Sequence, residues 1–184
     1  MKNATITHEI IVIDDIEGDR RLEYYLPWWA EHTQKEKHML SVTPESLKKE
    51  LLVATIILSE NDEIIGAAGI VGGRNKKNRE IIHRDRKVVE LGSNVVDLDF
   101  RGNGLGKELI LKRIEICKIN NWFPVSVTTN PLVHKIFESI NAVPMDDLEE
   151  YVLLRKQLCL FGASCKEKIC NSCPLNKKGG WIFE

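Results

Sequence analysis

The sequence predicts a mixed α/β domain in which a central sheet is flanked by helices. Runs rich in β-branched residues alternate along the chain with segments whose apolar residues recur three and four positions apart. A glycine-rich stretch, RGNGLG at residues 101–106, stands between a strand-like run and a helical segment. The length of 184 residues, without internal repeats, suits one domain of ordinary size with a short extension.

The chain begins with a predicted strand and a predicted helix. Residues 6–13 (ITHEIIVI) are rich in β-branched side chains and predict the first strand. Asp19 is a suitable N-cap for a helix that follows it. Four apolar residues recur at helical spacing after this cap: Leu22, Tyr25, Leu26 and Trp29. Pro27 lies among them and predicts a break or kink in the helix.

A second helix and a hairpin come next. Thr43 as N-cap and Pro44 at the first helical position predict a short helix. The runs at 54–59 and 63–71, with turn residues at 61–62 between them, predict a β-hairpin. The remaining predicted elements are a strand at 88–98, a helix to about residue 120, a strand at 124–129, a helix at 131–140 and a strand at 151–158.

The glycine-rich stretch predicts a site for an anion. Glycines let the backbone turn tightly and come close to a ligand, so that several N–H groups converge on it. The helix that begins near Gly104 directs the positive end of its dipole to the same place. The order of strand, glycine loop and helix therefore predicts a phosphate cradle.

Residue spacing separates this loop from two well-known phosphate loops. A Walker loop needs four residues between its glycines and then Lys followed by Ser or Thr. Only three residues separate Gly102 from Gly106 here, and Lys107 is followed by Glu108. A dinucleotide-binding loop needs two residues between its second and third glycines, whereas only Leu105 stands between them in this chain.

The spacing that fits is Arg101, two residues, Gly104, one residue and Gly106, with Val96 five positions upstream of the arginine. This pattern resembles that of the GNAT superfamily of acyl-CoA-dependent N-acetyltransferases, and the predicted order of elements matches it over roughly residues 4–158. The resemblance implies the GNAT fold, a mixed central sheet that is splayed at the CoA site and flanked by helices. The alternative is that RGNGLG is an ordinary glycine-rich turn in another α/β domain.

The resemblance also implies a binding site for acetyl-CoA, with the pantetheine arm between the glycine-loop strand and the next strand. A backbone N–H near Val96 would bind the thioester carbonyl and stabilise the oxyanion. Asn130 matches an asparagine that contacts the CoA arm. The residues implied to hold the pyrophosphate are Arg101, Gly102, Asn103, Gly104, Leu105, Gly106 and Lys107.

Four aromatic residues fall in the region that forms the wall of the acceptor site in this fold, with core packing as the alternative role: Tyr24, Tyr25, Trp28 and Trp29.

Candidate catalytic groups follow from the proton transfers that the reaction needs. Glu90 is the candidate base, because strand alternation places Glu90 and Val96 on one side unless a bulge intervenes. A solvated glutamate is the alternative interpretation. Phe137 stands where the resemblance implies a tyrosine acid, and phenylalanine has no proton to donate. His134, one turn earlier, is the candidate acid, with a half-buried structural histidine as the alternative.

Four of the five cysteines lie within fifteen positions, with five, four and two residues between them: Cys159, Cys165, Cys170 and Cys173. Residues 159–184 are too few to bury a core of their own, so they predict a metal-binding tail after a GNAT domain at 1–158. In a cytoplasmic protein a metal is favoured over a disulfide. Four thiolates suit tetrahedral zinc, and an iron–sulfur cluster or no metal are the alternatives.

Charge and hydropathy restrict the partners. The net charge of -1 gives no reason for a polyanion partner, and aromatic residues are not interleaved with the basic segment at 74–87, so nucleic acid is not expected. The chain has no run of 18 apolar residues and does not start like a signal peptide, which predicts a soluble, cytoplasmic protein without a membrane partner.

Together these features predict an enzyme that transfers an acetyl group from acetyl-CoA to a primary amine by direct attack. The identity of the amine and the oligomeric state are left open. One alternative is an acyl-CoA-binding sensor with little catalysis, motivated by Phe137. The other is a metal-stabilised docking module for protein or nucleic acid.

Overall fold

The computed structural model describes residues 6–36, 42–73, 80–128, 130–145, 154 and 180–183. The chain forms two compact units. The first unit comprises Met1–Val71 and Leu91–Glu115, and the second comprises Gly72–Glu90 and Ile116–Glu184. Strand β5 (Arg86–Val96) contributes residues to both units.

The sheet of the first unit has the strand order β1, β2, β3, β5. The bounds of the first three strands are His8–Ile13 for β1, Leu51–Ser59 for β2 and Ile64–Gly72 for β3. Both β1–β2 and β2–β3 are antiparallel, and Ala54 pairs with Ile13 on one side and with Gly69 on the other. The predicted hairpin is therefore confirmed, with Asp62 of its turn at a φ of 59°.

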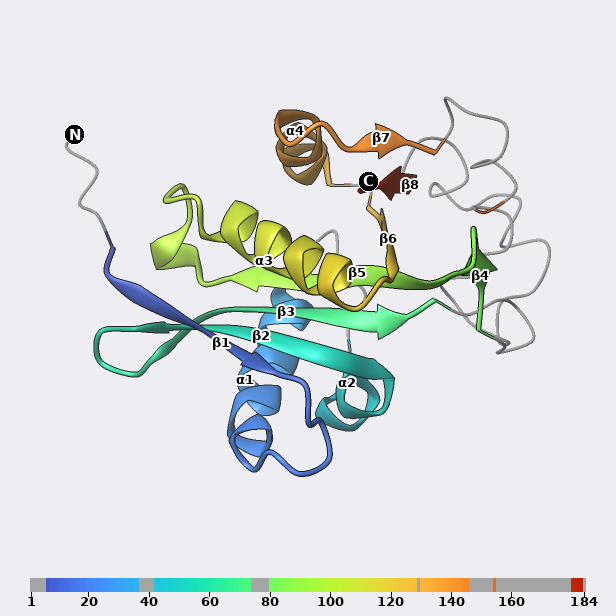
Figure 1. Ribbon diagram of the computed structural model, residues 1–184. Helices are drawn as coiled ribbons and strands as arrows, with labels where there is room; N and C mark the ends of the chain where they lie inside the picture. The colour runs from blue at the N-terminus through green and yellow to red at the C-terminus, as the bar shows by residue number, and fades with distance from the viewer. Residues whose placement is uncertain are drawn as a thin grey trace. The chain divides into compact units, whose positions relative to one another are not determined.

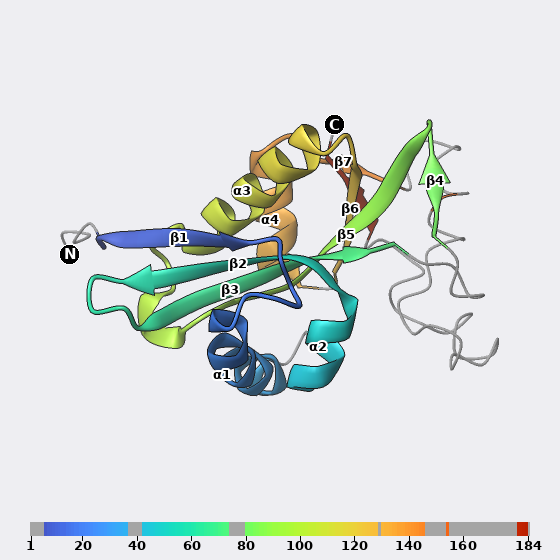
Figure 2. The ribbon, with the colours of Figure 1, turned by 60° about the horizontal axis from the view of Figure 1, so that its bottom comes forward.

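Helices cover both faces of this sheet. The helices are α1 (Arg21–Lys35), α2 (Pro44–Glu50) and α3 (Leu105–Ile119). Figures 1 and 2 show α1 and α2 on one face and α3 on the other. One buried cluster joins the first two helices to the sheet and includes Leu22, Trp29, Leu47, Ile56, Ala67 and Val95. The cluster under α3 includes Ile57, Ile65, Ala68, Leu105 and Leu109. Because both faces are covered, β2 and β3 are buried along most of their length, which explains their unbroken apolar sequences.

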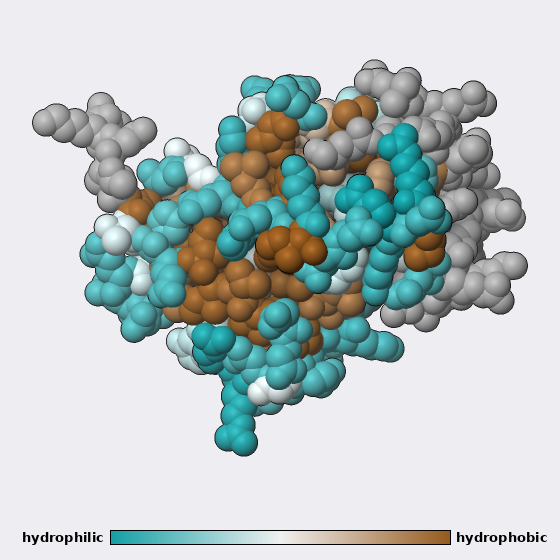
Figure 3. Space-filling model, in the orientation of Figure 1, coloured by the Kyte–Doolittle hydropathy of each residue, from teal (hydrophilic) through white to brown (hydrophobic). Residues whose placement is uncertain are grey.

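Strand β1 is less deeply covered than its neighbours. It lies at the edge of the sheet, and Ile10, Ile11 and Val12 are only half-buried. Figure 3 shows apolar residues gathered on the surface between β1 and α3. The single β-branched run at residues 6–13 thus forms a strand that is partly open to solvent.

The observed N-cap matches the predicted one in α2 but not in α1. For α2 the capping box is complete, because Ser46 N–H donates to Thr43 Oγ1 at 3.2 Å and Thr43 N–H donates to Ser46 Oγ at 2.9 Å. For α1 the predicted cap is displaced by one residue, since Arg20 occupies the N-cap position. The Asp19 carboxylate nevertheless accepts the Arg21 N–H at 2.9 Å.

Of the break or kink expected at Pro27, the break is wrong, because α1 continues through this residue. A proline inside a helix removes one backbone hydrogen bond and strains the preceding turn. Leu22 and Trp29, which lie on either side of Pro27, are both fully buried. Their packing in the core stabilises the helix on both sides of Pro27.

The second unit is built on the first part of β5. Its other elements are β4 (Ile82–His83), β6 (Phe123–Val127), α4 (Pro131–Ser139), β7 (Val143–Pro144) and β8 (Gly180–Ile182). Strands β5 and β6 are parallel, with Val88 opposite Phe123 and Glu90 opposite Val125. Strand β8 pairs antiparallel with both β6 and β7. The mixed sheet predicted from the sequence is confirmed.

The C-terminal end of the sequence prediction needs correction. Leu154, the one described residue of the strand expected at 151–158, is helical. The antiparallel partner of β6 is instead β8, which belongs to the segment interpreted as a tail. Strands β4, β7 and β8 have two or three residues each, and such short strands carry no detectable periodicity. The boundary expected at residue 158 and all four clustered cysteines lie outside the described residues.

No helix in the described ranges is long and apolar enough to cross a membrane.

Candidate active site

The glycine loop, residues 101–106, connects β5 to α3 by way of a short 3-10 turn at Leu98–Phe100. Gly102 has a φ of 83° and Gly104 a φ of 86°, a region that residues with a side chain rarely adopt. A Cβ added at either position would meet no atom within 4 Å. The two glycines are therefore required by backbone conformation, and the space beside them is open to a ligand.

Backbone N–H groups are the donors that this loop offers. The first hydrogen bond of α3 runs from Glu108 N–H to the Gly104 carbonyl at 3.1 Å, and the N–H groups before it have no partner within the helix. Among the described residues, the N–H groups of Gly102, Asn103 and Gly104 have no acceptor. The Asn103 side chain folds back onto the Phe100 carbonyl at 3.1 Å. This arrangement suits an anion at the positive end of the helix dipole.

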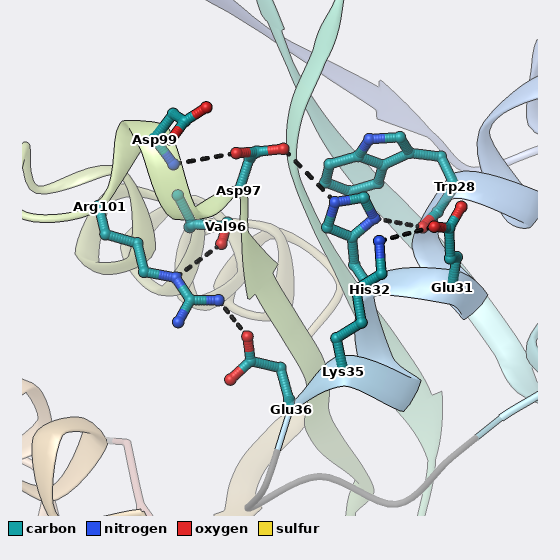
Figure 4. A network of polar contacts seen from close by, with 9 residues as sticks. All are labelled: Trp28, Glu31, His32, Lys35, Glu36, Val96, Asp97, Asp99 and Arg101. Carbon is teal, nitrogen blue, oxygen red and sulfur yellow. Dashed lines mark hydrogen bonds and ion pairs between the residues drawn. The ribbon is translucent and has the colours of Figure 1, made fainter.

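Figure 4 shows the polar contacts that join the end of α1 to the segment after β5. Arg101 Nε donates to the Val96 carbonyl at 2.9 Å, and Nη2 of the same side chain forms an ion pair with Glu36. His32 Nε2 lies 3.4 Å from one oxygen of Asp97, whose other oxygen accepts the Asp99 N–H at 3.0 Å. The Arg101 side chain thus binds Val96 and Glu36 within the chain.

Sequence reasoning missed Glu36 and His32, which the structure places beside the loop through an ion pair with Arg101 and a polar contact with Asp97. They lie more than sixty positions before their partners in the chain. His32 is further held by Trp28, since its ring stacks on the indole at 3.8 Å between centroids and its Nδ1 donates to the Trp28 carbonyl at 2.8 Å. No local pattern in the sequence signals these contacts.

The direction of the Val96 N–H, the candidate oxyanion donor, follows from the hydrogen bond of the next residue. Asp97 N–H donates to the Ile65 carbonyl of β3 at 2.9 Å. Successive N–H groups of a strand point to opposite edges, so the Val96 N–H points away from β3. The Val96 carbonyl is held by Arg101, as Figure 4 shows.

A kink interrupts β5 between the candidate base and Val96. Ser93 has a φ of 50°, which is not a strand conformation. The simple alternation that predicts one shared side for Glu90 and Val96 is therefore interrupted between them. Glu90 itself is half-buried and pairs with Val125 in the second unit.

The remaining predicted site residues lie on or beside α4 in the second unit. Asn130 caps α4, because its Oδ1 accepts the Leu132 N–H at 3.0 Å. His134 is half-buried, and its Nε2 donates to the Thr128 carbonyl at 3.0 Å. The structure thus gives both residues local partners on which their orientation depends.

Phe137 belongs to an aromatic cluster. It is 2% exposed, and its ring meets Phe183 edge-on at 5.0 Å and Trp181 at 5.6 Å between centroids. The position where the resemblance implies a tyrosine is therefore part of an apolar core. A phenol at this position would bring a hydroxyl into the same buried cluster.

The described residues contain no group of three or more His, Cys, Asp or Glu side chains that could hold a metal. Cys117 is the one cysteine among them, and it is buried in α3 without a disulfide. Its burial is typical of a cysteine that packs as a small apolar core residue.

The comparison with known proteins decides the family. The chain matches the Acetyltransferase (GNAT) family over residues 14–131. It belongs to this family. The match includes β5, the glycine loop, α3 and β6, so the family resemblance read from Arg101, Gly104 and Gly106 is confirmed.

Individual GNAT relatives share little sequence identity with this chain or match only part of it. N-acetylaspartate synthetase of Danio rerio is 32% identical over 88 residues, which are 46% of this chain and 29% of that protein. N-acetylglutamate synthase from Neisseria gonorrhoeae, solved with coenzyme A and N-acetyl-glutamate, has a TM-score of 0.58 at 13% identity and covers 95% of this chain and 34% of its own. Rv2747 from Mycobacterium tuberculosis, solved with CoA and NLQ, has a TM-score of 0.63 at 10% identity and covers 94% and 98%. The two structures share the fold, and this chain spans less than two thirds of the synthetase and of the synthase.

The first turn of α3 carries a further ion pair that responds to pH. His8 Nε2 lies 2.8 Å from Glu108 Oε2. The hydrogen bond from its other nitrogen to the Ile6 carbonyl raises the pKa of His8, burial opposes this, and Glu108 adds to the rise. Because the folded state binds this proton more tightly than the unfolded state, the pair stabilises the fold at low pH. That contribution declines as pH rises through the raised pKa.

We therefore expect His8→Gln to destabilise the protein more at acidic than at alkaline pH. The free energy of unfolding should fall by about 0.5 kcal/mol at about pH 5.5, which is below the ordinary histidine pKa. The decrease should be smaller at about pH 8.5. Urea unfolding at both pH values measures it. Thr7→Ala, next to the site but without a titrating group, serves as the control. A loss for His8→Gln that is equal at the two pH values would contradict the sign of the pKa change.

Proposed function

We propose that this protein is an N-acetyltransferase that moves the acetyl group of acetyl-CoA to a primary amine. The observation that carries the proposal is the glycine loop of a GNAT family member, with two glycines at positive φ. The N–H groups of Gly102, Asn103 and Gly104 in this loop have no acceptor among the described residues. A pyrophosphate is the anion that this arrangement suits.

The reaction needs an attack, an oxyanion site and two proton transfers. The amine nitrogen attacks the thioester carbonyl carbon, and the negative charge that develops on the carbonyl oxygen is stabilised by the Val96 N–H. Glu90 takes the proton that the amine loses. The carbon–sulfur bond then breaks, and the thiolate accepts a proton from His134 or from water. The roles of Glu90, Val96 and His134 are part of the proposal, as is contact of Asn130 with the CoA arm.

The relatives suggest a class of amine. The names of the Danio rerio synthetase and of the Neisseria gonorrhoeae synthase both describe the acetylation of an acidic amino acid. We therefore propose the α-amino group of an acidic amino acid as the acceptor. A sensor with little catalysis is the second candidate, and Phe137 in its apolar cluster is the observation that favours it.

Release of free thiol from acetyl-CoA, measured across a panel of amines, tests this proposal. L-aspartate and L-glutamate should accelerate release, and N-methylated or esterified forms should not. Binding of acetyl-CoA without acceleration by any amine would favour the sensor. In the active case, Glu90→Gln should lower kcat about a hundredfold at neutral pH and leave acetyl-CoA binding unchanged. Wild-type turnover by Glu90→Gln would exclude Glu90 as the base.

The conformation of the glycine loop gives a separate prediction for acetyl-CoA binding. An alanine at Gly104 has to adopt a φ near 86°, which costs about 1–2 kcal/mol, and its Cβ would enter the space of the anion. Gly104→Ala should therefore weaken acetyl-CoA binding about tenfold or more in isothermal titration. Gly72→Ala is the matched control, since Gly72 has open space around a Cβ and no positive φ. Equal affinities for the two variants would rule out the loop as the anion site.

We further propose that the four clustered cysteines bind zinc, with an iron–sulfur cluster as the alternative. Their number and spacing support this, and the cytoplasm, which we propose as the compartment, keeps thiols reduced. Elemental analysis of anaerobically purified protein should give about one zinc per chain, and Cys170→Ser should lose it. Iron with a brown colour would identify the cluster instead. Cys117→Ser is the control, because Cys117 is buried in α3.

A further inference from the structure

The kink in β5 is held from the two faces of the first unit's sheet. Ser93, at a φ of 50°, has a backbone conformation that residues with a Cβ adopt only where their surroundings impose it. The carbonyls of Gly92 and Ser93 are successive backbone groups, and each is bound by a side chain from a different helix. The donors are Trp29 of α1 and Arg113 of α3.

On the α1 face the donor is an indole. Trp29 Nε1 donates to the Ser93 carbonyl at 2.8 Å, and the side chain is fully buried. Its ring lies against β3 at Gly69, where an added Cβ would come within 3.2 Å of Trp29 Cη2. Gly69 thus lets the indole approach the sheet closely enough to reach the next strand.

On the α3 face the donor is a guanidinium. Arg113 is 1% exposed, and its Nη1 donates to the Gly92 carbonyl at 3.0 Å and to the Gly69 carbonyl at 2.9 Å. Its Nε donates to the Leu109 carbonyl of its own helix at 3.1 Å, which fixes the direction of the side chain. A buried cation with several donors in a rigid plane bridges β3 and β5 at the kink.

The kink determines the directions of the side chains and N–H groups in the part of β5 that follows it. Past Ser93, Asn94 Nδ2 donates to the Gly106 carbonyl at 3.2 Å, and Val95 is buried in the cluster under α1. Asp97 N–H then binds Ile65, which leaves the Val96 N–H on the opposite edge. A strand shifted by one residue would reverse these directions and would turn the Val96 N–H toward β3.

We propose that Trp29 and Arg113 are positioning residues that hold the kink at Gly92–Ser93 and thereby aim the Val96 N–H at the thioester carbonyl. This inference rests on the proposed function and adds two residues that touch neither substrate. The strained φ of Ser93 is maintained because the Gly92 and Ser93 carbonyls are both held by buried donors. Loss of one donor lets the strand relax and moves the Val96 N–H.

The test uses Trp29→Phe, which removes the indole N–H and keeps an aromatic ring. Because the oxyanion contact forms fully only in the transition state, kcat should fall about tenfold to a hundredfold while KM for acetyl-CoA stays near the wild-type value. Arg113→Lys, which lacks the Nε bond to the Leu109 carbonyl that fixes the direction of the side chain, should lower kcat in the same way. Trp122→Phe is the matched control, since the Trp122 indole donates to no described residue.

A second measurement does not depend on turnover. In nitrogen-15 NMR spectra, the wild-type Val96 amide should shift more with acetyl-CoA than with CoA, because only the former has the thioester carbonyl. Trp29→Phe and Arg113→Lys should lose this difference and still respond to CoA at the glycine loop. The melting temperature and the dispersion of the spectrum show whether each variant is folded. Only results from a folded variant are used to judge the proposal.

The outcomes separate the two levels of the proposal. If both folded variants keep the wild-type kcat and the wild-type Val96 response, the positioning role is overturned while the proposed function stands. A loss of CoA response at the glycine loop in these variants also overturns it, because the role would then be general to the fold. If wild-type protein responds to neither acetyl-CoA nor CoA, the proposed function fails and this inference fails with it.

Discussion

The candidate site of the first unit depends on backbone N–H groups that take no part in the hydrogen bonds of the sheet and the helices. At the end of β5 the Val96 N–H points away from β3, and at the start of α3 the glycine loop leaves several N–H groups without an acceptor in the described chain. A backbone donor has no side chain of its own to orient it. Its direction is set by the path of the chain, so the path has to be held rigidly.

Side chains provide that rigidity. Arg101 ties the loop to Val96 and to Glu36 at the end of α1, and Asp97 ties the following turn to His32. Arg113 and Trp29 hold the kink at Gly92–Ser93, which precedes Val96 in β5. The side chains of Arg101 and Asp97 therefore bind other residues of the protein, and main-chain donors and the helix dipole are available for an anion.

The second unit presents a different constraint, which is apolar. Phe137 is enclosed by Trp181 and Phe183, residues from the far C-terminal part of the chain. Strand β8 brings them there by pairing with β6, with Ser126 opposite Trp181. A phenylalanine at the position of the expected tyrosine is thus explained by packing. The aromatic cluster also links the last helix to a segment that the sequence interpretation had separated from the domain.

The sequence by itself determined the long elements and the family. The β-branched runs, the Thr43–Pro44 helix start and the glycine spacing at Arg101, Gly104 and Gly106 are local patterns, and local physics is enough to interpret them. Only the tertiary structure decided that Pro27 stays within a helix, that β8 completes the sheet, and that Ser93 kinks β5. Each of these depends on contacts between residues far apart in the chain, such as Trp29 with Ser93, and a window of neighbouring residues contains no trace of such contacts.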